Sequence, residues 1–66
     1  MIMNKFEKKT LLGDAMVLSR ANPKDVHYVL YGGCFGFVTT DVEKAKTWMS
    51  QGYKLYCKML DGQMIL

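Results

Sequence analysis

The chain has 66 residues, of which nine are lysine or arginine and six are aspartate or glutamate, so its formal net charge at neutral pH is +3. Half of the residues are hydrophobic, which excludes a disordered chain, and no stretch reaches the roughly 20 apolar residues of a membrane helix. A chain of about 60 residues buries only about 60% of its unfolded surface. We therefore expect one small cytoplasmic domain over residues 1–66, with a thin core and no membrane contact.

The first twenty residues contain a polar segment and a segment with two possible structures. Residues 1–9 are mostly polar, and we expect a frayed N-terminal arm without a signal peptide. Residues 10–20 fit either a turn at Gly13 followed by a short apolar strand, or a helix ended by Pro23. Glycine costs a helix about 1 kcal/mol relative to alanine, which slightly favours the strand. One face of the helix would carry Leu11, Leu12, Ala15, Met16 and Ser19.

Residues 26–39 predict a β-hairpin that is apolar on both faces. Two alternating runs flank Gly32-Gly33, which tolerates the positive φ angles of a two-residue turn and would place Leu30 opposite Phe35. A hairpin with one solvated face would be polar at every second position, so both faces need a cover. One face carries Val26, Tyr28, Leu30, Phe35 and Phe37, and the other carries His27, Val29, Tyr31, Cys34, Gly36 and Val38.

Residues 40–51 predict an amphipathic helix. Thr40 and Glu43 have the spacing of a capping box, and Gly52 stands where a left-handed C-cap is expected. We expect this helix to pack on the small-residue face around Gly36, which has room for the tryptophan, and to leave the aromatic face of the hairpin uncovered. The apolar stripe of the helix is Val42, Ala45, Trp48 and Met49.

Residues 53–60 alternate as a strand, Asp61-Gly62 predicts a two-residue turn, and residues 63–66 form a short closing strand. We therefore expect an α+β fold in the order β (or α)-β-β-α-β-β. It consists of a small antiparallel sheet of about four to five strands with one amphipathic helix on one face. The strand would direct Tyr53, Leu55, Cys57 and Met59 to one side, and Lys54, Tyr56, Lys58 and Leu60 to the other.

The chain has few residues of the types that support catalysis or bind a metal ion. In the expected register His27 lies roughly 13 Å from Cys34 along the strands, whereas a catalytic dyad needs about 3 Å. Two cysteines are too few for a disulfide framework, and no cysteine or histidine pair has metal-ligand spacing. We expect a non-enzymatic protein with reduced thiols, no cofactor and no metal.

One segment matches a pattern of nucleic-acid-binding proteins. Residues 33–40, Gly-Cys-Phe-Gly-Phe-Val-Thr-Thr, resemble the central-strand octapeptide of the RNA recognition motif, with the match at residues 35–38 and departures at positions 33, 34 and 40. The resemblance implies that Phe35 stacks on a base of single-stranded nucleic acid. Basic and aromatic residues on one strand suit the same ligand, although strand lysines also protect an edge from aggregation. The expected nucleic-acid site is Phe35, Lys54, Tyr56 and Lys58.

The first hypothesis for function is nevertheless protein binding. Aromatic residues and methionine are enriched at interface cores, and the hairpin offers an aromatic face without an obvious cover. We expect this face to bind a protein partner or a second copy of the chain. In size the chain is similar to phage-type accessory proteins that inhibit or regulate host enzymes and defence systems. The expected contact residues are Tyr28, Leu30, Phe35 and Phe37.

Overall fold

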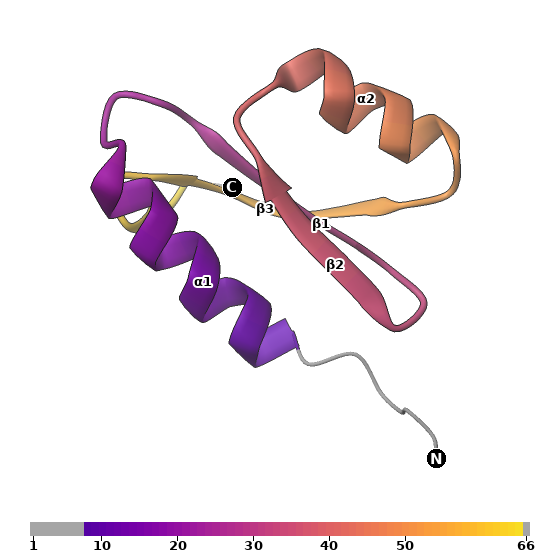
Figure 1. Cartoon of the computed structure of the whole chain (residues 1–66), viewed down its shortest axis with the longest axis horizontal. Helices are drawn as coiled ribbons and strands as arrows, with labels where there is room; N and C mark the ends of the chain where they lie inside the picture. Colours follow the sequence, from indigo (N-terminus) through magenta and orange to yellow (C-terminus); the bar gives the residue numbers. More distant parts are fainter. Residues whose placement is uncertain (1–7, 66) are drawn as a thin grey trace.

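The computed structural model describes residues 8–65, without the side chain of Lys8. It confirms an α+β fold: two helices lie on opposite sides of a four-stranded antiparallel sheet whose strand order is β2-β1-β3-β4 (Figure 1). Residues 1–7 of the expected N-terminal arm lie outside the described range. The elements are α1 (Lys8–Ala21), β1 (His27–Gly32), β2 (Phe35–Thr39), α2 (Val42–Ser50), β3 (Lys54–Leu60) and β4 (Gln63–Met64).

The ambiguous segment is the helix α1, so the slight preference for a strand was wrong. Leu11, Ala15 and Ser19 are spaced by four residues, and all three are buried against the sheet. This burial outweighs the helix penalty of Gly13, which lies on the exposed side with open space around it. The helix begins at Lys8, two residues before the expected segment and inside the expected N-terminal arm, and it ends before Pro23 as expected.

The β1–β2 turn lies one residue later than expected, at Gly33-Cys34. Leu30 therefore pairs with Phe37, and Gly32 with Phe35. Gly33 has a φ of +59° at the first turn position. Gly32 is the last residue of β1, and the ring of Tyr53 lies only 3.1 Å from an ideal Cβ there, a tight contact for any side chain. The observed pairing register differs from the expected one by two residues, so each strand residue lies on the face that the sequence indicated. Cys34 leaves the small-residue face and lies exposed in the turn.

The α2 helix covers the aromatic face of the hairpin, not the small-residue face on which it was expected. α1 packs on the small-residue face, where Leu11 and Ala15 are buried against residues of β1 and β3. α2 packs on the aromatic face, where Trp48 contacts Phe37 with ring centroids 4.8 Å apart. Both faces are therefore covered from within the chain. The cluster under α1 consists of Leu11, Ala15, Val29, Cys57 and Met59.

A β-bulge interrupts the alternation of β3. Val29 pairs with Cys57 but Leu30 pairs with Leu55, so Tyr56 is an extra residue on the β3 side. Tyr56 packs against the cluster under α1, on the same side as Cys57. The expectation of strict alternation along residues 53–60 was therefore wrong.

The C-terminal turn is as expected. Asp61 and Gly62 both have positive φ angles, +53° and +75°, as a type I′ turn requires. β4 is shorter than the expected closing strand, and Ile65 beyond it donates a backbone hydrogen bond of 2.9 Å to Lys58. Within residues 8–65, no helix has the length and apolar character needed to cross a membrane.

Candidate functional site

Four aromatic rings gather where the hairpin tip meets the end of α2. Phe35 and Phe37 come from β2, Trp48 from the last turn of α2, and Tyr53 from the residue before β3. The Trp48 ring lies 4.8 Å from Phe37 and 4.7 Å from Tyr53, both in tilted or edge-on geometry. Such contacts are the favourable arrangements for aromatic pairs. We call these four residues the aromatic cluster.

The end of α2 positions two of the four rings. The N–H of Tyr53 donates to the carbonyl of Trp48, and the N–H of Gly52 to that of Met49, both over 3.1 Å. This is a Schellman motif, in which the first residue after the left-handed glycine packs on the residue five positions earlier. Gly52 has a φ of +107°. The helix stop that the sequence indicated therefore also brings Trp48 and Tyr53 into contact.

The other end of α2 is capped one residue later than expected. The Asp41 carboxylate accepts hydrogen bonds from the N–H groups of Glu43, at 2.9 Å, and Lys44, at 3.3 Å. Asp41 is therefore the N-cap, and the expected capping box of Thr40 and Glu43 does not form.

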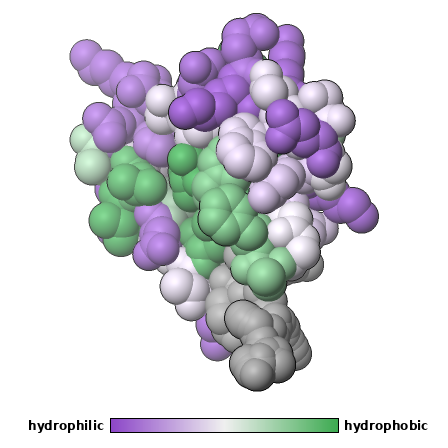
Figure 2. Space-filling view, turned by 45° about the vertical axis from the view of Figure 1, so that its right-hand side comes forward, coloured by the Kyte–Doolittle hydropathy of each residue, from purple (hydrophilic) through white to green (hydrophobic). Residues whose placement is uncertain are grey.

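Phe35 is the most exposed ring of the aromatic cluster, with 51% of its surface accessible, whereas the other three are half-buried. Its ring lies 6.0 Å from Tyr53, 6.4 Å from Phe37 and 6.5 Å from Trp48. Figure 2 shows hydrophobic surface gathered across the middle of the face that this view brings forward, with polar surface above it. The cluster thus presents a supported apolar ring to solvent.

The expected protein-binding residues share one face, as the pairing of β1 with β2 shows. Leu30 is completely buried, so it cannot contact a partner. Tyr28 is half-buried at the other end of the strand, where the Lys58 amine lies 5.9 Å from its ring centre. Sequence reasoning did not assign Trp48 and Tyr53 to this site, although two aromatic residues around a C-cap glycine are the signal for their contact.

The expected nucleic-acid residues are divided between the two faces of the sheet. Lys54 pairs with Tyr31 and therefore lies on the α1 side, as does Tyr56 at the bulge. Lys58 pairs with Tyr28 on the α2 side, the side of Phe35. Residues 33–40 also form the turn and an edge strand, not the central strand that the resemblance to the RNA recognition motif implied.

Cys57 and His27 are buried, whereas Cys34 is exposed in the β1–β2 turn. Cys57 is 1% exposed, and burial raises the pKa of its thiol, which keeps it protonated at neutral pH. His27 is buried, and its Nδ1 lies 2.9 Å from the carbonyl oxygen of Asp25. Within the described part of the chain, no three His, Cys, Asp or Glu residues group as metal ligands.

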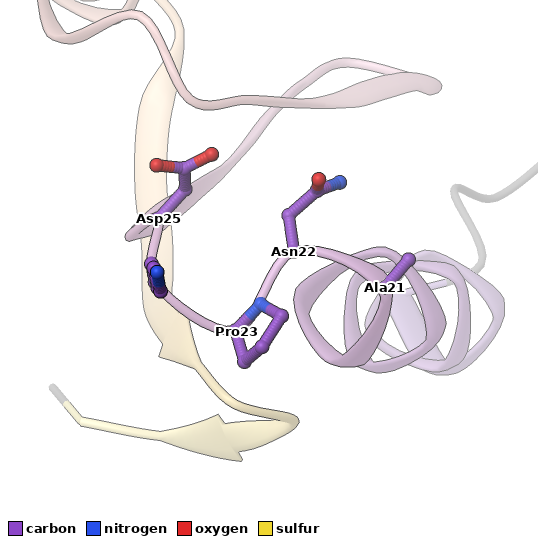
Figure 3. A pocket seen from close by; sticks show the side chains of 5 residues that line it. Ala21, Asn22, Pro23 and Asp25 are labelled. Atoms are coloured by element: carbon purple, nitrogen blue, oxygen red, sulfur yellow. The ribbon is translucent and has the colours of Figure 1, made fainter.

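A shallow depression lies in the loop between α1 and β1 (Figure 3). Its volume is about 260 Å³, and its walls come from five consecutive exposed residues. The loop is closed by a hydrogen bond of 3.1 Å from the N–H of Asp25 to the carbonyl of Asn22. Ligand sites normally enclose most of their ligand between separate elements, which one loop does not do. The lining residues are Ala21, Asn22, Pro23, Lys24 and Asp25.

Comparison with protein-family models, curated proteins and solved structures finds no match to this chain.

Proposed function

We propose that this chain is a small protein-binding module that contacts its partner through the aromatic cluster. The observation that supports this proposal is the position of Phe35, half exposed and flanked by three other rings. A side chain that is already held in place loses little conformational entropy when it binds. Aromatic anchors of this kind, surrounded by less critical contacts, supply most of the free energy of protein association.

A stable protein interface covers roughly 800 Å² on each partner. The chain has a total accessible surface of 4435 Å², so an interface of that size would occupy about a fifth of it. The rings alone cannot supply that area, and β2 and α2 would contribute the surrounding contacts. Such a protein acts by covering a surface of a larger one, which suits an inhibitor or regulator of the phage-accessory type.

A photo-crosslinking experiment tests this proposal. We would place p-benzoyl-phenylalanine at position 35 or, as the matched control, at position 65, where Ile65 is equally exposed on the C-terminal segment. Irradiation in cells should give a discrete protein adduct from position 35 and none from position 65. The F35A variant should then lose capture of that protein, while I65A keeps it.

Two results would contradict protein binding through the cluster. One is unchanged capture by F35A at unchanged stability. The other is capture that disappears on nuclease treatment and weakens with salt, which would indicate nucleic acid instead.

A further inference from the structure

Within residues 8–65, β2 is an edge strand without the usual protection against pairing. Among the described strands it has a neighbour only on the β1 side, and in Figure 1 no helix passes in front of it. Its sequence, Phe-Gly-Phe-Val-Thr, contains no charge and no proline. Proteins normally block an edge with lysine, proline or a bulge, or keep it very short. The other edge strand, β4, has only two residues and is short in this sense.

The two-residue turn shows which backbone groups of β2 point outward. Gly32 and Phe35 flank that turn, and the residues that flank such a turn are hydrogen-bonded to each other. Hydrogen-bonded and non-hydrogen-bonded pairs alternate along an antiparallel ladder, so Phe37 is bonded to Leu30. The N–H and C=O groups of Gly36 and Val38 therefore point away from β1, toward the open edge.

We propose that a second copy of this chain pairs with β2 in antiparallel orientation, about a two-fold axis at Phe37. In this register Gly36 of each copy is opposite Val38 of the other, and the two residues exchange both of their outward hydrogen bonds. The pairing satisfies the same groups on both chains, as a two-fold interface requires. It joins two four-stranded sheets into one.

The Phe37 side chains favour a second copy over an unrelated strand. The two Phe37 rings meet on the α2 side, and aromatic cross-strand pairs stabilise a sheet. The chain carries a net charge of +3, so two copies repel each other over much of their surface, but β2 is neutral and five residues long.

The test compares two substitutions at one position. G36A and G36P both add a side chain, but only proline removes the outward N–H. In sedimentation and light-scattering measurements, the unchanged protein and G36A should reach twice the 7.6 kDa of one chain, and G36P should remain a monomer. Near-ultraviolet circular dichroism of Trp48 reports whether G36P is folded.

Amide hydrogen exchange on the unchanged protein tests the same pairing without a substitution. Exchange at Gly36 and Val38 should slow at least about tenfold from micromolar to millimolar concentration, whereas Phe37, bonded within the chain, should change little. A monomer at millimolar concentration, a dimeric G36P, or fast exchange at Gly36 and Val38 throughout would overturn the proposal. Crosslinking from position 35 in monomeric G36P would show that partner binding is separate from self-association.

Discussion

The hydroxyl of Ser19, which is fully buried in α1, accepts a hydrogen bond of 2.7 Å from the N–H of Gly62 in the β3–β4 turn. The bond joins residues 43 positions apart in the sequence. It fastens the C-terminal end of α1 to the last turn of the sheet. The helix thus gains a specific polar attachment in addition to the apolar contacts of Leu11 and Ala15.

Replacement of Ser19 by alanine should lower the free energy of unfolding by about 1–3 kcal/mol, because the Gly62 N–H would remain buried without a partner. Urea denaturation measures the change. The control is S50A, which removes an exposed hydroxyl that donates only to Thr47 of its own helix and should cost less than about 0.5 kcal/mol. Equal losses for S19A and S50A would contradict the role of the Ser19 bond.

Substitution of Asp41 and of its neighbour Thr40 tests which of the two residues caps α2. Loss of the Asp41 carboxylate in D41A leaves the N–H groups of Glu43 and Lys44 unpaired and should cost about 0.5–2 kcal/mol. T40A should be nearly neutral, although Thr40 is the cap that the sequence spacing indicates. Thermal unfolding of the two variants distinguishes the caps, and a larger loss for T40A would favour the capping box.

Gly52 links the end of α2 to the aromatic cluster. No atom lies within 4 Å of a Cβ added there, so G52A is opposed only by its left-handed backbone conformation, at a cost of roughly 1–2 kcal/mol. G52N should cost less, because asparagine is the other residue that this position accepts. The fluorescence of Trp48, the only tryptophan, should shift to longer wavelength more in G52A than in G52N. Equal shifts would contradict the conformational explanation.

The two cysteines should differ in reactivity. Cys34 is exposed in the turn and should react with a thiol reagent at once, whereas Cys57 should react only when the protein unfolds. Because burial raises the Cys57 pKa, the thiol favours folding below its unfolded pKa of about 8.5. That contribution is lost as the pH rises through the folded pKa. Stability measured in C34A should therefore fall above about pH 9, and rapid labelling of Cys57 at neutral pH would contradict its burial.

Much of the local structure follows from short sequence patterns. The helix of residues 42–50, the stop at Gly52 and the Asp61-Gly62 turn each depend on residues that are neighbours in the chain. The faces of the hairpin also follow, since a register error of two residues leaves every strand side chain on its own side. These features needed no knowledge of distant contacts.

Local sequence patterns predicted only two of the four rings of the aromatic cluster. Phe35 and Phe37 were found because strand alternation places them together. Trp48 and Tyr53 were missed because the α2 helix was expected on the opposite face of the sheet. The nucleic-acid set was divided by the bulge at Tyr56, which no local pattern indicated.

Local sequence patterns specify the order of elements after residue 26, the Asp61-Gly62 turn and the sides of the hairpin, because these depend on backbone preferences and on side-chain periodicity. Long-range packing makes residues 8–21 a helix and selects which helix covers which face of the sheet. Those outcomes depend on how closely distant side chains fit. Leu11 and Ala15 pack on the small-residue face of the hairpin, and Trp48 packs against the rings of Phe37 and Tyr53. The burial of Leu11 and Ala15 outweighs the roughly 1 kcal/mol by which Gly13 opposes a helix.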